Sequence, residues 1–155
     1  MTELRYEPFV YERDIQACEQ LSLREADTTT IKCFDFKSVC AAVHHNLITS
    51  HKSWTILNQD NQVYGIAGVA YVGCAGTPWM FAEERIKEDT KGFFAGSHKM
   101  IAEMLEDVDY LYNYVWEKHD YSIRWLKKLG FTFRYDEVLE VGGENFIYYD
   151  KGTAL

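Results

Sequence analysis

A short amphipathic helix with a clear stop signal constrains this chain more than any other feature. Residues 120–129 have the helical spacing that puts Ser122 on the same face as Leu126. Asp120 is the expected N-cap, and Gly130 is the expected glycine just past the helix end. An aromatic and β-branched strand at 110–116 precedes this helix, and a hairpin over 131–149 with the turn Gly142-Gly143 follows it. This strand, helix and hairpin predict the closing half of an α/β domain.

The rest of the chain supplies the elements for the opening half. We expect a strand at 4–10, limited to a sheet edge by Pro8, then helices at 11–22 and 36–48 around a polar break at 27–30. Strands at 54–57 and 63–72 follow as a hairpin, then a short apolar strand at 79–82 and a helix from about residue 90. The order is β-α-α-β-β-β-α-β-α-β-β in one domain over 1–155. The segment 79–116 should form a right-handed parallel crossover.

The net charge of the protein limits the classes of molecule that it can bind. The 155 residues carry a net charge of −8, with a sequence pI of about 5.1. The negative electrostatic potential of such a protein repels the phosphate backbone of nucleic acids, so we expect no nucleic-acid partner. A cationic protein or polyamine substrate is compatible with it, although an acidic surface that simply maintains solubility is the simpler explanation.

The cysteines and the hydropathy of the chain indicate the cellular compartment of the protein. The four cysteines show no CxxC pairing, which favours reduced thiols. No apolar run approaches the length of a membrane span and no secretion leader opens the chain, so we expect no membrane association and a cytoplasmic location.

We predict no metal site, because His44, His45 and His51 lack evident cysteine or carboxylate partners at ligand spacing.

The segment 119–131 resembles the last conserved block of the GNAT superfamily of acyl-CoA N-acetyltransferases, roughly N-x-x-(A/S)-x-x-L-Y-x-K-x-G-F. His119 stands at the asparagine position and Leu126 at the tyrosine position. The matching positions are Ser122, Lys128, Gly130 and Phe131. The resemblance implies a mixed, mostly antiparallel sheet with helices on both faces. It also implies acetyl-CoA as co-substrate and an amine acceptor, on a small molecule, a lysine or a protein N-terminus.

A narrower resemblance is carried by Leu-Tyr-Asn-Tyr-Val-Trp at 111–116 together with 122–130. These segments are similar to the small GNAT-like proteins of short-tailed phages, some of which are internal virion or head-assembly proteins. This resemblance implies a host cytoplasmic or virion location and a host or virion protein partner. A homodimer is left open.

The resemblance also implies a site for the CoA pyrophosphate at a helix N-terminus. The family loop reads (Q/R)-x-x-G-x-(G/A), and its nearest register here is 91–96, with Phe94 at the central glycine. The expected cofactor contacts are Phe81, Ala82, Lys91, Gly92, Phe94, Ala95, Gly96, Ser97, His119 and Trp125. The alternative, which base rates for short motifs favour, is that Gly92 and Gly96 merely flank a helix start and Phe94 is core.

Amide formation from a thioester needs a base for the amine and an acid for the leaving thiolate. Glu83 and Glu84 follow the strand 79–82 and are the candidate bases; the alternative is a solvated charge cluster. Tyr121 and Ser122 are the candidate acids in place of the missing tyrosine; the alternative is a cap or surface role. The irregular loop and Leu126 favour a second function, a GNAT scaffold that acts through contacts rather than catalysis.

Overall fold

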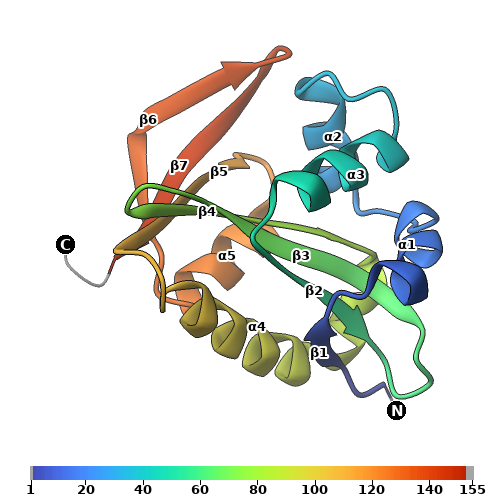
Figure 1. The fold of residues 1–155 in the computed structure, drawn as a ribbon. Helices are drawn as coiled ribbons and strands as arrows, with labels where there is room; N and C mark the ends of the chain where they lie inside the picture. The colour runs from blue at the N-terminus through green and yellow to red at the C-terminus, as the bar shows by residue number, and fades with distance from the viewer. Residues whose placement is uncertain (1, 153–155) are drawn as a thin grey trace.

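The nearly continuous apolar run of strand β3 (Val63–Val72) forms the centre of the sheet. The computed structural model describes residues 2–152, and β3 is buried on both faces over most of its length. The strands form one seven-stranded sheet in the order β1-β2-β3-β4-β5-β7-β6 (Figure 1). The other strands are β1 (Arg5–Pro8), β2 (Lys52–Leu57), β4 (Ala75–Ala82), β5 (Tyr110–Trp116), β6 (Thr132–Val141) and β7 (Glu144–Gly152).

The sheet is mixed and mostly antiparallel, which confirms the predicted fold class. Only β4 and β5 pair in parallel, at the crossover predicted for 79–116. The short strand β1 lies at the edge of the sheet beside β2, where Pro8 removes no interior ladder bond.

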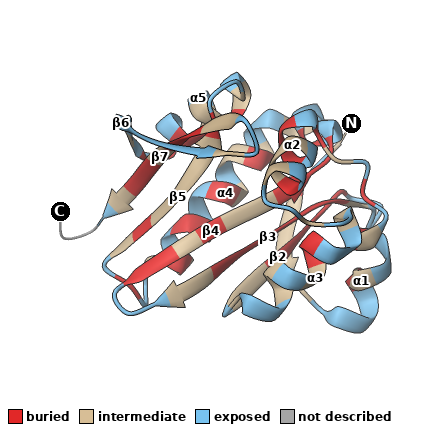
Figure 2. Ribbon diagram, turned by 90° about the horizontal axis from the view of Figure 1, so that it is seen from above, coloured by how far each residue is buried: buried red, intermediate tan, exposed pale blue. Residues whose placement is uncertain are grey.

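Helices cover both faces of the sheet (Figures 1 and 2). Helices α4 (Thr90–Met104) and α5 (Asp120–Lys128) pack on one face, where Met100, Ile101 and Leu126 join the core with Val69. Helices α1 (Tyr11–Glu19), α2 (Glu25–Cys33) and α3 (Val39–Thr49) pack on the other face around Ile66. A 3₁₀ helix, η1 (Glu84–Asp89), joins β4 to α4. None of the helices within residues 2–152 is long and apolar enough to cross a bilayer.

Helix α2 occupies the segment that we expected to be a polar break. Its polar side chains are satisfied locally: Arg24 Nε and Nη2 donate to the two Asp27 oxygens at 2.9 and 3.0 Å, and Thr30 Oγ1 donates to the Ala26 carbonyl. Ile31 packs into the core below. Three helices therefore separate β1 from β2, one more than predicted.

The end of α5 is the stop that the sequence indicates. The Phe131 amide donates to Leu126 O and the Gly130 amide to Lys127 O, which is a Schellman motif, with Gly130 at φ +96°. The start differs from the prediction. His119 is the N-cap residue and makes no side-chain capping bond, while Asp120 is the first residue of the helix.

Candidate active site

Strands β4 and β5 are paired only at their first residues. The parallel register joins Ala75 to Tyr110 and Gly76 to Leu111, and no later pair follows. Asn113 Nδ2 donates to the Pro78 carbonyl at 2.6 Å and makes the last link between the strands. Beyond it the strands diverge around a cleft of about 430 Å³. Residues of α2 and α3 line it on one side and residues of α5 on the other, so it passes through the sheet.

The main chain of β4 supplies hydrogen-bonding groups to this cleft. The Ala82 amide donates to Asp27 Oδ2 at 3.0 Å, and Ala82 O accepts from the Arg24 amide at 3.0 Å, so the peptide groups of Ala82 face away from β3. Because strand residues alternate in direction, the peptide groups of Met80 face the same way, into the cleft. The predicted cofactor residue Ala82 is thus covered by α2, whereas Phe81 lines the cleft with its side chain. Sequence reasoning missed Met80, because no local pattern marks where strands diverge.

Two tryptophans that line the cleft have indole N–H groups without a hydrogen-bond acceptor in the described part of the chain. Among residues 2–152, Trp116 Nε1 and Trp125 Nε1 are the buried side-chain polar atoms without a hydrogen-bond partner. Both indoles line the cleft, and each nitrogen can only donate. Buried donors are normally satisfied, so this pair fits a ligand that carries carbonyl oxygens.

His119 and Ser122 stand at the α5 side of the cleft. Ser122 is buried, and its Oγ lies 3.3 Å from His119 Nε2. Burial, together with the positive charge of Arg24, lowers the pKa of His119 to about 4. The imidazole is therefore neutral at physiological pH and can exchange a proton with the Ser122 hydroxyl.

The two candidate bases have other partners. Glu83 is buried, but its Oε2 accepts from the Ser22 amide at 2.9 Å and its Oε1 from Arg85 Nε at 2.6 Å. Glu84 is exposed, and its hydrogen bond with Lys87 lowers its carboxyl pKa. Neither lines the cleft. Glu83 holds the chain before α2 and Glu84 is exposed beside Lys87, so the role of base stays a prediction for both.

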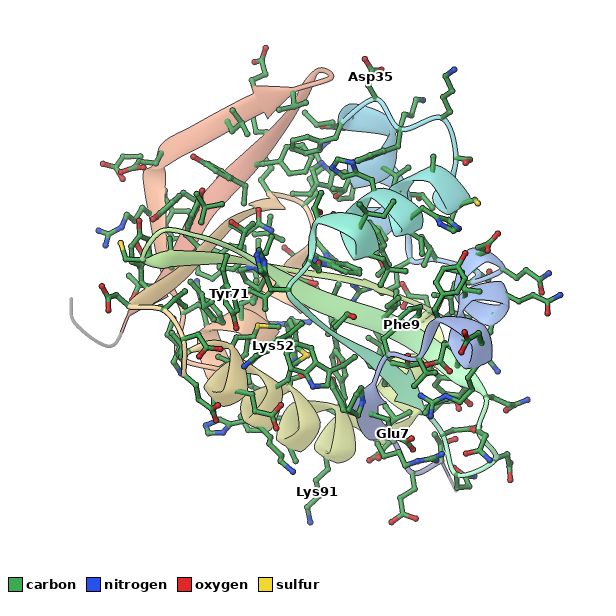
Figure 3. The ribbon with its side chains drawn as sticks, viewed as in Figure 1. Glu7, Phe9, Asp35, Lys52, Tyr71 and Lys91 are labelled. Carbon is green, nitrogen blue, oxygen red and sulfur yellow. The ribbon has the colours of Figure 1, made fainter. Side chains whose placement is uncertain are left out.

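A second concavity, the α4–α5 groove, combines positive charge with aromatic surface. Its volume is about 780 Å³. Figure 3 shows Lys91 extending outward from the first turn of α4. The residues that line the groove are Thr90, Lys91, Phe94, Tyr121, Arg124, Trp125 and Lys128. Trp125 lines both concavities and stacks on Phe93 with ring centroids 4.9 Å apart, so the groove and the cleft share a wall. The groove fits an anionic ligand.

The N-terminus of α4 is already occupied by a carboxylate. Asp89 Oδ1 accepts from the Gly92 amide at 2.9 Å, and Oδ2 accepts from the Leu4 amide at 2.8 Å. A Cβ on Gly92 would lie 2.0 Å from Asp89 Oδ2, so this glycine serves the cap. The predicted binding of phosphate at this helix terminus does not fit, because Asp89 takes its place.

The remaining predicted loop residues serve the packing of α4 on β1. Ser97 is fully buried, with its Oγ 2.6 Å from the Tyr6 hydroxyl. A Cβ on Gly96 would lie 2.3 Å from the Tyr6 ring, so only glycine permits this approach. Ala95 is exposed and lines neither concavity. Of the predicted cofactor contacts, the structure brings together Lys91, Phe94 and Trp125 in the groove, and Phe81, His119 and Trp125 in the cleft.

No family model matches the sequence, and no curated protein sequence matches it. Solved structures do match. A GCN5-related N-acetyltransferase from Kribbella flavida aligns with a TM-score of 0.70 at 12% identity, covering 96% of this chain and 97% of that one. A GNAT-family acetyltransferase from Bacillus anthracis aligns over 100% of both chains, with a TM-score of 0.69 and 12% identity.

Spermidine N-acetyltransferase from Vibrio cholerae, solved in complex with CoA and spermine, aligns with a TM-score of 0.68 at 9% identity, over 98% of this chain and 96% of that one. At such identities the likeness is one of fold. The chain has the fold of the GNAT acetyltransferases.

Proposed function

We propose that the protein is an N-acyltransferase that transfers an acetyl group from acetyl-CoA to an amine. The observation that carries this proposal is the cleft between β4 and β5, which is lined by Met80 and by Trp116 and Trp125, whose buried indole nitrogens have no hydrogen-bond partner within residues 2–152. A thioester chain with amide groups offers the carbonyl oxygens that these donors lack. The neighbours of the same fold that are described as acetyltransferases support this reading.

The α4–α5 groove supports the placement of the cofactor phosphates. Lys91, Arg124 and Lys128 are three positively charged residues that line the groove. Trp125 lines both the groove and the cleft and so connects them. Charge-assisted contacts to phosphate are the strongest that such side chains make. In this arrangement the phosphates lie on side chains rather than on the start of α4.

The chemistry of transfer assigns a task to each remaining group. CoA supplies an acyl thioester, from which the amine takes the acyl group. The Met80 amide is the donor available for charge that develops on a carbonyl oxygen in the cleft. The Ser122 hydroxyl donates its proton to the leaving thiolate and regains one from His119 Nε2–H, while the imidazole Nδ1 takes up, through solvent, the proton that the attacking amine releases. With a pKa of about 4, His119 is neutral at physiological pH.

The acceptor is an amine that carries positive charge near its reactive nitrogen. The net charge of −8 favours cations, and residues of α2 and α3, among them Asn46, line the cleft. A polyamine, a lysine side chain or a protein N-terminus meets this requirement. One neighbour of the same fold is described as a spermidine N-acetyltransferase.

Calorimetric titration with acetyl-CoA tests the proposal directly. At a ligand concentration a hundred times Kd, binding should raise the free energy of unfolding by about 2.7 kcal/mol. Lys91→Ala and Arg124→Ala should each weaken binding roughly tenfold, through loss of a charged hydrogen bond. Lys99→Ala, an exposed lysine of α4 outside the groove, is the matched control and should bind normally.

Acetyl transfer is then measured as release of free thiol with polyamines, a lysine peptide and a peptide with a free N-terminus. Absence of any heat or thermal shift with millimolar acetyl-CoA would reject the enzyme. Binding that is unchanged in both groove variants would reject the phosphate placement alone.

The second candidate function is a GNAT-fold structural or host-interaction protein without catalysis. Asp89 favours it, because this residue fills the helix terminus that the family uses for phosphate. Under this proposal, the segments 111–116 and 122–130 indicate a phage lineage, with a host or virion protein as partner and a location in the host cytoplasm or the virion. The titration separates the two functions, since this candidate requires no CoA affinity.

A homodimer through β6 is a further part of this proposal. Strand β6 ends the sheet and is exposed over most of its length. Tyr135, Val138 and Leu139 are exposed apolar residues on it. The register shift between Arg134 and Val138 interrupts its pairing, which limits such an association to part of the strand. Sedimentation analysis of the chain and of a Val138→Lys variant tests it: a monomer in both would exclude the dimer.

A further inference from the structure

Helices α1 and α3 bring three potential metal ligands together outside the lining of the cleft. Glu19 ends α1, and Cys40 and His44 lie one turn apart on α3. One ligand atom from each lies within 4.8 Å of the other two. The spacing of four residues puts Cys40 and His44 on one helix face, as in helical zinc motifs. The predicted absence of partners for His44 is wrong: Cys40 lies four residues before it in the sequence, and Glu19 is brought to it from another helix.

Cys40 and His44 each lie beside one oxygen of the Glu19 carboxylate. Cys40 Sγ lies 3.3 Å from Glu19 Oε2, and His44 Nε2 lies 3.3 Å from Glu19 Oε1. Ligands of a tetrahedral zinc ion at its usual bond lengths are about 3.5 Å apart. One ligand atom from each group lies within 4.8 Å of the other two, so the three must close in by about an ångström at most to surround a cation. The ring of Tyr11 lies edge-on to His44, at 6.4 Å between centroids, and restricts the imidazole.

We propose that Glu19, Cys40 and His44 bind one divalent zinc-like ion, with water in the fourth position. Thiolate, imidazole and carboxylate are the ligands that zinc prefers, and together they compensate its charge. Cys40 is exposed and Glu19 and His44 are half-buried, so the ion can enter from solvent. Binding replaces the thiol proton of Cys40, which leaves to solvent.

The ion would fasten α1 to α3. Helix α3 also contributes His45 and Asn46 to the lining of the cleft. Metal binding would thus stiffen the helical wall on the side where an acceptor enters. This role is independent of catalysis, and it applies equally if the chain acts only through contacts.

Competition with a chromophoric zinc chelator tests the site on the full, metal-stripped chain. We expect one Zn²⁺ per chain, and with Co²⁺ a thiolate-to-cobalt charge-transfer band. Cys40→Ser and His44→Gln should each weaken Zn²⁺ binding roughly a hundredfold, since one of three protein ligands is lost, and Cys40→Ser should abolish the band. Calorimetry in buffers of different ionisation enthalpy should report release of a proton.

Two matched controls guard against adventitious binding. Cys74→Ser replaces another exposed cysteine, and His98→Gln replaces an exposed histidine of α4. Both should bind like the parent chain. Equal weakening by these controls, no stoichiometric Zn²⁺ in the parent, or a cobalt band that persists in Cys40→Ser would each overturn the proposal.

Discussion

At the scale of the single residue, the contact between Tyr6 and Ser97 separates a structural role from a binding role. The Tyr6 hydroxyl also donates to the Phe93 carbonyl at 3.2 Å, so the pair ties β1 to α4. Ser97→Ala should lower the free energy of unfolding by about 1 kcal/mol, as for one buried hydrogen bond. Affinity for acetyl-CoA should not change. Urea denaturation and calorimetry measure the two effects.

A double-mutant cycle with Tyr6→Phe provides the control for this contact. The two losses should be less than additive, because each variant removes the same bond. Ser97→Ala protein that is fully stable yet binds CoA poorly would return Ser97 to the cofactor site.

His119 should give the protein a distinctive pH dependence. Its pKa in the folded state is about 4, below the ordinary 6.5, because of burial and the charge of Arg24. The folded state therefore resists its protonation: the contribution is complete above pH 6.5 and is lost as the pH falls toward 4. With allowance for partial exposure, this loss is on the order of 1–2 kcal/mol.

His119→Asn cannot titrate and should lack this component. The measurement is the free energy of unfolding of both proteins by urea between neutral and mildly acidic pH. Their difference isolates the histidine from carboxylates that titrate in both. Parallel pH profiles for the two proteins would contradict the lowered pKa.

At the scale of the element, Asp89 sets how α4 begins. Asp89→Ala should cost about 1–2 kcal/mol of stability, since the amides of Gly92 and Leu4 both lose an acceptor. Asp89→Asn retains a capping oxygen but removes the charge. If phosphates lie near this terminus, the Asn variant should bind acetyl-CoA about threefold more tightly, through relief of repulsion.

Thermal denaturation and calorimetry of the two variants distinguish the cap from the charge. The expected outcome is tighter binding in Asp89→Asn with a stability between those of the parent and Asp89→Ala, because the asparagine oxygen can accept from the Gly92 amide but its amide nitrogen cannot accept from the Leu4 amide. Weaker binding in that variant would mean that the carboxylate itself assists the ligand.

At the scale of the whole molecule, the sheet consists of two parts, β1–β4 and β5–β7–β6, whose strands share two paired positions and one side-chain hydrogen bond within residues 2–152. Asn113→Asp keeps the shape of the link but cannot donate to the Pro78 carbonyl. We expect a loss of at least about 1 kcal/mol, because a carboxylate then faces a carbonyl oxygen. Urea unfolding measures it. A variant as stable as the parent would show that the hydrogen bond from Asn113 to the Pro78 carbonyl does not contribute to the free energy of unfolding.

The sequence predicts what depends on neighbours along the chain. The buried run of β3 and the glycine stop at Gly130 are both local, and both agree with the structure. The role of Gly96 is not local, because the ring that requires it, Tyr6, belongs to a distant strand. Helix α2 was missed because its polar residues are satisfied by one another, which composition does not reveal.

The candidate site depends even more on distant partners. His119 and Ser122 are visible in the sequence as neighbours on one short helix, and the structure brings them to the cleft. The Met80 peptide and the Trp116 indole matter only because two strands diverge, and divergence is a property of the assembled sheet. The resemblance implies a phosphate contact for Gly92, whereas in the structure the Asp89 carboxylate approaches this glycine and caps α4.

The incomplete pairing of β4 with β5 has a consequence for the exchange of hydrogen with solvent. A seven-stranded sheet ordinarily has two edges, but past Gly76 this one has four, two of them in its interior. The amide of Met80 should therefore exchange as fast as that of an outer strand, although its neighbours on β3 are among the best protected. A ligand that lies along the cleft would act as an inserted strand and slow that exchange selectively.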